Sequence, residues 1–229
     1  MRKLFLLTIA AVTFMLQANA GGFQVGLQGQ RQTGMGLIGT GYLTGPSAVF
    51  FNPGGMSFLQ GQYSFSLGIS PIVSTVAFQY EEPSLYEAQT NNPVSLPFSL
   101  YGAGKINEKL SVGLGVYTPY GSYYGLGRRL AWKTHRSGYF PYGYLFSAYC
   151  FLQITETLGI GAGFIYAYGD VELNKGFPLQ NQNGEEGQIN VNGSTANYGF
   201  NAGLYFEPSK TFSLGVTYRS EIYDGSGRR

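Results

Sequence analysis

The glycine run from Gly34 to Gly39 is the first stretch whose residue types and spacing could bind a cofactor. Its sequence, GMGLIG, matches the G-x-G-x-x-G pattern, which in dinucleotide-binding proteins follows a buried strand and opens a helix. Here the preceding residues 28–33 are polar, and the following residues are glycine-rich and end at Pro46. Because neither flank fits, we expect no dinucleotide site and no other cofactor. We interpret these glycines as sites of close packing.

The single histidine, His135, and the single cysteine, Cys150, restrict the remaining catalytic chemistry. A serine hydrolase needs a histidine oriented by a third group, whereas His135 lies among the polar residues Lys133, Thr134 and Arg136. One histidine, one cysteine and scattered carboxylates do not make a metal site. We therefore predict that the protein is not an enzyme and has no metal ligands.

Residues 1–20 have the three-part organisation of an export signal. Arg2 and Lys3 precede the apolar stretch Leu4–Leu16, and Ala18-Asn19-Ala20 is a small-x-small cleavage site. The apolar stretch is shorter than the roughly 20 residues that a membrane-spanning helix needs, so we expect cleavage before Gly21. Without Arg2 and Lys3, the fourteen lysines and arginines become twelve, against twelve acidic residues. A formally neutral mature chain argues against a nucleic-acid partner.

After residue 60 the chain contains about seven segments in which apolar residues alternate with glycine, serine and other small or polar residues. They lie at 64–70, 95–103, 110–117, 144–154, 158–166, 200–207 and 212–219. This alternation is typical of strands with one apolar face. It places Cys150 on the face suited to lipid and Tyr149 on the opposite face. Arg219 and Glu221 share the inward face, where we expect them to pair across the wall.

The connections between these segments indicate where such a sheet would lie. Short polar turns at 106–109, 155–157 and 208–211 alternate with long loops at 81–94, 119–141 and 174–197. Outer-membrane barrels have this arrangement, because their periplasmic turns are short and their extracellular loops long. Only 11% of the residues are charged, whereas about a quarter are charged in soluble domains. We predict an all-β fold, a transmembrane antiparallel β-barrel, with an odd number of strands that leaves the barrel incomplete.

Residues 21–60 are rich in glycine, glutamine and threonine and nearly free of charge. They show neither a helical stripe nor sustained alternation, and we interpret them as a plug inside the barrel. Three parts of this stretch, Gly22-Phe23-Gln24, Met35-Gly36 and Phe51-Asn52-Pro53-Gly54, resemble the N-terminal hatch of the FadL/TodX family of outer-membrane channels. Residues 217–221, TYRSE, resemble a family sequence near the middle of the barrel.

This resemblance implies a domain organisation and a location. The signal peptide would be residues 1–20, the hatch residues 21–60, and residues 61–229 about seven strands of a fourteen-stranded barrel whose C-terminal half is missing. The protein would lie in the bacterial outer membrane, surrounded by its lipids and lipopolysaccharide, as a monomer when full length. Its partners would be fatty acids or other hydrophobic small molecules.

The family resemblance also implies a transport mechanism. Ligand would bind in the lumen beside Phe23, the hatch would shift, and ligand would leave sideways through a kinked strand. Asn52, Pro53 and Gly54 would form the hatch turn, with Gly54 in place of the usual alanine. The kink would fall at Gly113 and Gly115, because glycine lets a strand bend sharply.

A basic cluster, Arg128, Arg129, Lys133 and Arg136, is interleaved with Leu126, Leu130 and Trp132. It could be a solvated loop that holds lipopolysaccharide phosphates. Alternatively, Arg128 and Trp132 could bind the carboxylate and the tail of a fatty acid, as polar groups in mostly apolar sites do. A second function for the whole chain also stays open, a non-transporting surface barrel or adhesin whose long loops bind a partner.

Overall fold

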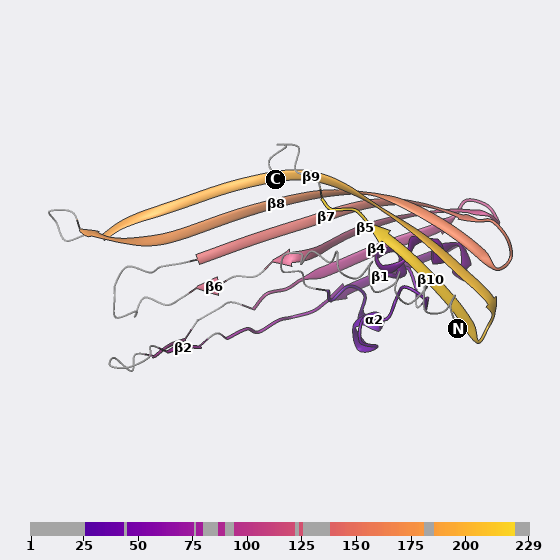
Figure 1. Cartoon of the computed structure of the whole chain (residues 1–229), viewed down its shortest axis with the longest axis horizontal. Coiled ribbons are helices and arrows are strands. Elements are labelled where there is room, and N and C mark those ends of the chain that lie inside the picture. The colour runs from indigo at the N-terminus through magenta and orange to yellow at the C-terminus, as the bar shows by residue number, and fades with distance from the viewer. Residues whose placement is uncertain are drawn as a thin grey trace, which may run out of the picture.

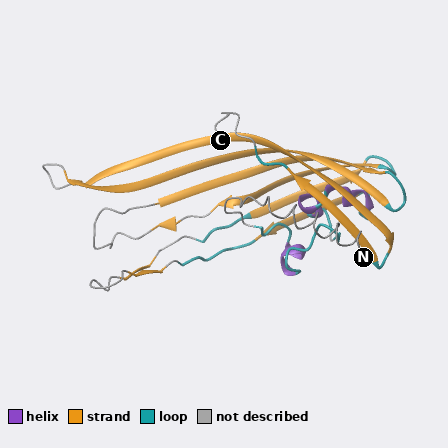
Figure 2. Cartoon of the chain, in the orientation of Figure 1, coloured by secondary structure: helices purple, strands orange, loops and turns teal. Residues whose placement is uncertain are grey.

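A computed structural model describes residues 26–43, 45–75, 77–79, 87–89, 94–121, 124–125, 138–180 and 186–222. Most of these residues form one curved antiparallel sheet with a short N-terminal segment on its concave side (Figures 1 and 2). Seven strands follow one another across the sheet in chain order. They are β1 (Tyr63–Ile69), β4 (Phe98–Lys105), β5 (Leu110–Gly121), β7 (Gly138–Gln153), β8 (Leu158–Gln180), β9 (Glu186–Ser209) and β10 (Phe212–Arg219).

Three short strands lie outside this order. The two-residue strand β6 (Tyr124–Gly125) pairs with β7, while β2 (Ala77–Gln79) and β3 (Glu87–Gln89) pair only with each other among the described residues. The prediction of an all-β fold with about seven antiparallel strands is confirmed, and the described strands form half of a barrel. In the described part of the chain, no helix is both long and apolar enough to cross a bilayer.

The two faces of the sheet carry the residues that the alternation predicted. Apolar side chains on the convex face are exposed, with Phe65 at 78% and Leu114 at 66% of their full accessibility. Cys150 is exposed on the same face, whereas its neighbour Tyr149 is 4% exposed on the concave face. The predicted parity of β7 is therefore correct.

The short turns are closed by side-chain hydrogen bonds. In the β4–β5 turn, Asn107 Oδ1 accepts bonds from the backbone N–H groups of Lys109 (2.9 Å) and Leu110 (2.8 Å). In the β7–β8 turn, Thr155 Oγ1 accepts corresponding bonds from Thr157 (3.2 Å) and Leu158 (3.0 Å). A short polar side chain at the first turn position replaces a backbone acceptor. Both turns lie where the sequence predicted them.

The prediction of a long loop at 174–197 is wrong. β8 and β9 stay paired through Asn174↔Asn190 and as far as Gln180↔Glu186, so only residues 181–185 separate the two strands. The apolar residues of this stretch, such as Ile189 and Val191, do not continue the outward apolar face of Tyr198 and Phe200, and backbone pairing does not need such a face. Similarly, Pro141 lies within β7 and pairs with Val171. Most of the loops predicted at 81–94 and 119–141 falls outside the described residues.

The N-terminal segment, residues 26–59, contains three short helices. They are α2 (Gln30–Gly34), α3 (Ala48–Phe51) and the 3₁₀ helix η1 (Pro53–Phe58). The segment lies beneath the sheet, toward the end that carries the short turns (Figure 2). Its buried residues Ala48, Val49 and Met56 join the concave-face side chains Tyr101, Tyr117 and Phe151 in one hydrophobic core.

Candidate functional site

The turn that joins α3 to η1 is held by the side chain of Asn52, which is fully buried. Its Oδ1 accepts a hydrogen bond from Gly54 N–H (2.9 Å) and so caps η1, which has Pro53 at its start. Its Nδ2 donates to the carbonyl oxygens of Thr40 (2.7 Å) and of Leu204 in β9 (3.1 Å). One amide therefore ties together the turn, the preceding loop and the wall, with both of its amide hydrogens used.

The wall beneath this turn has a patch of four glycines, Gly159 and Gly161 in β8, Gly203 in β9 and Gly215 in β10. A Cβ atom at Gly161 would lie 2.5 Å from the carbonyl oxygen of Pro53, and one at Gly159 would lie 2.5 Å from that of Gly54. At Gly203 it would overlap Asn52 Oδ1, and at Gly215 it would overlap the carbonyl oxygen of Thr40. The turn thus packs directly on backbone, which only glycine permits here. We call these four residues the glycine patch.

Gly54 belongs to the same contact. A Cβ at this position would lie 2.7 Å from the carbonyl oxygen of Gly203. The absence of a side chain is therefore explained by close approach to β9.

Further contacts fix the segment to both edges of the sheet. Gln30 Nε2 donates to the carbonyl of Ile69 at the end of β1 (2.8 Å). At the other edge, Ser213 Oγ and the Arg219 guanidinium donate to the carbonyls of Gly41 and Phe50, respectively. Arg219 also lies over the Phe50 ring, 4.1 Å from its centroid. The pairing of Arg219 with Glu221 that the sequence suggested is replaced by this contact with α3.

The concave face beside the glycine patch is lined by aromatic and polar side chains. The rings of Tyr101 and Tyr117 lie 5.6 Å apart, and Phe50 packs edge-on against Tyr117 at 5.2 Å. Tyr149 stacks on Phe151 at 6.0 Å. Tyr101 donates its hydroxyl hydrogen to Gln28 Oε1 (2.9 Å), so the segment also contacts this cluster. An interior of this kind suits a molecule that is mostly apolar.

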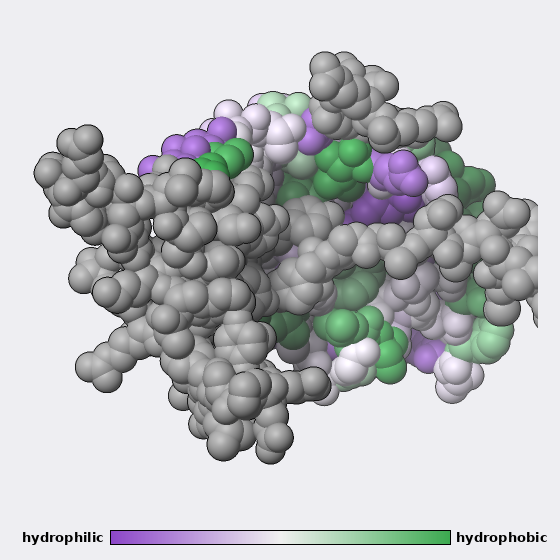
Figure 3. Space-filling view, turned by 60° about the vertical axis from the view of Figure 1, so that its left-hand side comes forward, coloured by the Kyte–Doolittle hydropathy of each residue, from purple (hydrophilic) through white to green (hydrophobic). Residues whose placement is uncertain are grey.

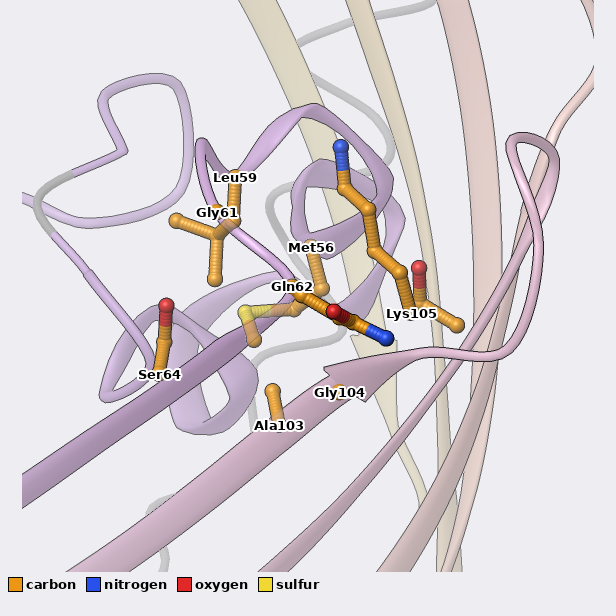
Figure 4. Close-up of a pocket in the computed structure, with 9 residues that line it drawn as sticks. Met56, Leu59, Gly61, Gln62, Ser64, Ala103, Gly104 and Lys105 are labelled. Atoms are coloured by element: carbon orange, nitrogen blue, oxygen red, sulfur yellow. The ribbon is translucent and has the colours of Figure 1, made fainter.

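A pocket lies where the segment meets the ends of β1 and β4 (Figure 4). Met56 and Leu59 line one side, and Ser64, Ala103 and Lys105 come from the wall. Lys105 is the charged residue among those that line it. In Figure 3, hydrophobic and hydrophilic residues are interspersed on the visible described surface, without one continuous patch of either kind.

The sequence profile of the outer membrane protein transport proteins (OMPP1/FadL/TodX) matches residues 10–224. The chain belongs to this family. Members of the OMPP1/FadL/TodX family are outer-membrane proteins. A comparison with curated proteins gave no match.

Solved structures of the OMPP1/FadL/TodX family share the fold. A Pseudomonas aeruginosa FadL homologue is 16% identical with a TM-score of 0.62, over 88% of this chain and 53% of its own. The toluene transporter TodX of P. putida is 17% identical with a TM-score of 0.63, over 82% of this chain and 54% of its own. A TodX deltaS2S3 mutant, a monoaromatic hydrocarbon channel, is 14% identical with a TM-score of 0.66, over 89% and 56%. This chain therefore spans about half the length of these relatives.

Only some of the predicted site residues lie in the part of the chain that the structure describes. Asn52, Pro53 and Gly54 do form a buried turn against the wall. Phe23, Arg128 and Trp132 lie outside the described residues, as do the signal peptide and His135. Among the described residues, no cluster of three or more His, Cys, Asp or Glu side chains could hold a metal ion.

Gly113 and Gly115, where the family resemblance implied a kink, belong to the regularly paired part of β5. Both residues lie in unbroken ladders, opposite Ala103 and Tyr101 on one side and Tyr149 and Ser147 on the other. The register shift in β5 falls later, between Tyr117 and Tyr120. Close packing explains these glycines, because a Cβ at Gly115 would lie 2.9 Å from the Tyr101 ring and one at Gly113 3.0 Å from Phe151.

Sequence reasoning missed the glycine patch and the contact between Arg219 and Phe50. The glycines of β8 were recognised only as small inward residues, since their partners lie more than a hundred residues earlier in the chain. The G-x-G-x-x-G run gives a mixed result. A Cβ at Gly39 would overlap the Phe51 ring, as expected for close packing, but nothing lies within 4 Å of one at Gly34 or Gly36. Gly36 instead has a positive φ of 72°, which favours glycine.

Proposed function

We propose that this chain is the N-terminal part of an outer-membrane channel for the uptake of hydrophobic compounds. The observation that carries the proposal is the seating of the N-terminal segment on the glycine patch of a family-typical wall. The contact between segment and wall consists of a few hydrogen bonds and close contacts between backbones. The segment can therefore act as a hatch that moves away from the wall while the strands stay folded. Transport of this kind needs no covalent chemistry, so the proposal includes no enzymatic activity.

The ligands would be fatty acids or other hydrophobic compounds, including monoaromatic hydrocarbons. Transfer from water stabilises a bound chain by about 0.8 kcal/mol for each buried CH₂ group, and aromatic walls such as Tyr101 and Phe151 serve alkyl chains and arenes alike. Phe23 and the cluster of Arg128 and Trp132 remain proposed contacts of the entering ligand. The hatch would move, and ligand would leave sideways into the membrane.

A reversible lock on the segment tests this function. Ser213 Oγ in β10 donates to the Gly41 carbonyl oxygen, and a Cβ built at Gly41 lies at ordinary contact distance from β10, 3.5 Å from the Gly215 nitrogen. Cysteines at Gly41 and Ser213 are therefore direct neighbours that can be joined by a disulfide without overpacking the glycine patch. We would replace Gly41 and Ser213 with cysteine in a Cys150→Ala background, within the full polypeptide that carries this chain. Cells expressing the double variant should take up labelled oleate or toluene only after reduction, while the two single-cysteine variants serve as controls. Equal uptake with the lock closed would contradict a moving hatch.

One observation favours a second function, that of a surface barrel or adhesin. β8 and β9 have 23 and 24 residues, well beyond the 9–11 that cross a bilayer, and they project past the other strands in Figure 1. Binding by this hairpin would be insensitive to the disulfide lock. Cell adhesion that persists with the lock closed, without ligand uptake in either state, would favour this alternative.

A further inference from the structure

Four buried polar atoms on the concave face have no hydrogen-bond partner. They are the hydroxyl oxygens of Tyr117 and Tyr149 and both side-chain polar atoms of Asn201. These residues are 0%, 4% and 1% exposed, respectively. Buried polar groups in folded proteins are almost always paired, so each exception calls for an explanation, such as a bound water or a ligand. The three side chains are therefore arranged for something that the chain itself does not provide.

The register brings Tyr149 and Asn201 together. Tyr149 in β7 and Asn201 in β9 both stand opposite Gly163 in β8. Because Gly163 has no side chain, the Tyr149 ring and Asn201 Oδ1 both reach the space above it. Tyr117 joins them from β5, since its hydroxyl lies near the side chains of Tyr149 and Ser147, but no donor or acceptor meets it at the distance and angle of a hydrogen bond. We call Tyr117, Tyr149 and Asn201 the hydroxyl cluster.

The chemistry of this cluster selects among ligands. Tyrosine hydroxyls and the asparagine amide are neutral and offer both donors and acceptors. Arg219 stands next to Asn201 in the register but points to the Phe50 carbonyl and ring. A carboxylate has no hydrogen to donate and would leave Asn201 Oδ1 without a donor. A hydrocarbon would satisfy none of the four atoms.

A neutral hydroxyl group both donates and accepts one hydrogen bond or more, and it matches the cluster. The neighbouring rings of Phe50 and Phe151 pack against Tyr117 and Tyr149 and can contact an apolar body. We propose that the hydroxyl cluster binds the head of a hydroxylated hydrophobic compound, such as a phenol or a long-chain alcohol. This inference rests on the proposed function, because the cluster is buried and the N-terminal segment, which packs on Tyr117 through Phe50, must move before a ligand enters.

Calorimetric titration of the full polypeptide in detergent with p-cresol and with toluene tests the inference, since the two probes differ by one hydroxyl. We expect p-cresol to bind more tightly. The affinity ratio should fall about tenfold in Asn201→Leu and in Tyr149→Phe, the loss expected for one hydrogen bond to a ligand. Tyr205→Phe is the matched control, because Tyr205 is also buried and its hydroxyl already donates to Glu207 (3.1 Å).

The outcomes separate this inference from the proposed function. Heat-dependent gel mobility confirms that each variant is folded before titration. If Asn201→Leu fails to fold, Tyr149→Phe, which removes a single oxygen atom, still tests the inference. Toluene binding with no preference for p-cresol, or a ratio unchanged in both variants, would overturn the hydroxyl site alone and leave water as the occupant. A folded protein that binds neither probe would overturn both proposals.

Discussion

Asn52 and the glycine patch show how single residues seat the N-terminal segment. The asparagine was predicted as part of a turn because Asn-Pro is a local signal that needs no knowledge of the fold. Its partners were not predictable, since Leu204 lies 152 residues further along the chain. The same limit applies to Gly161 and Gly203, which look like ordinary inward glycines until the turn is placed on them.

We predict that Gly161→Ala loosens the segment without unfolding the sheet. The added methyl group would lie 2.5 Å from the Pro53 carbonyl oxygen, and overpacking of this kind costs about 1–3 kcal/mol. Hydrogen exchange should therefore become roughly 5- to 150-fold faster in residues 45–58, with β7 and β8 unchanged. Gly193→Ala is the matched control, because nothing lies within 4 Å of its added Cβ. Equal effects of the two substitutions would contradict the inference that the N-terminal segment packs on the wall because Gly161 has no side chain.

A second prediction concerns the contact between Arg219 and Phe50. Arg219→Gln keeps a donor for the Phe50 carbonyl but removes the charge above the ring, whereas Phe50→Leu removes the ring and keeps the carbonyl. Cation–π contacts contribute about 0.5–2 kcal/mol. A double-mutant cycle, read from hydrogen exchange in α3, should show a coupling of this size. Additive effects would mean that Arg219 acts on α3 only through its hydrogen bond.

At the scale of elements, alternation identified the strands but not their full lengths. Between Leu158 and Tyr168 the outward residues of β8 are apolar, an eleven-residue stretch that matches the 9–11 residues of a membrane-crossing strand. Beyond this stretch the outward and exposed positions of β9 are Asn190, Asn192 and Ser194. The outward apolar face stops there, so the sequence indicated a loop where the backbone continues as a paired hairpin.

We therefore predict that the outer part of the β8–β9 hairpin is dispensable for membrane insertion. We would replace residues 173–191 with Asn-Gly, which favours a tight hairpin turn, within the full polypeptide that carries this chain. This variant should still insert into membranes and keep heat-dependent gel mobility. Insertion into lipid vesicles, followed by protease protection, measures this. The control deletes opposed residues inside the apolar stretch, 163–166 and 198–201, and should prevent insertion. Failure of the first variant to insert would show that the projecting hairpin contributes to folding.

At the scale of the whole molecule, the described strands form an open half-barrel. Within the described residues, β1 pairs only with β4, and β10 pairs only with β9. The odd number of strands in the sequence already indicated that these segments do not close by themselves. The sequence could not show that the N-terminal segment contacts both open edges, through Ile69 at the end of β1 and through Ser213 and Arg219 in β10.

Our last prediction is that the 229 residues expressed alone do not form a monomeric pore. The outer side of each edge strand presents a row of unpaired N–H and C=O groups, each of which costs several kcal/mol in hydrocarbon. Summed over β1 and β10, the penalty is on the order of tens of kcal/mol, far more than the few hydrogen bonds of the N-terminal segment offset. Open edges pair with other strands, so we expect aggregates or a closed dimer. Light scattering in detergent, together with gel mobility before and after heating, measures the outcome, and a heat-modifiable monomer that conducts ions would contradict the prediction.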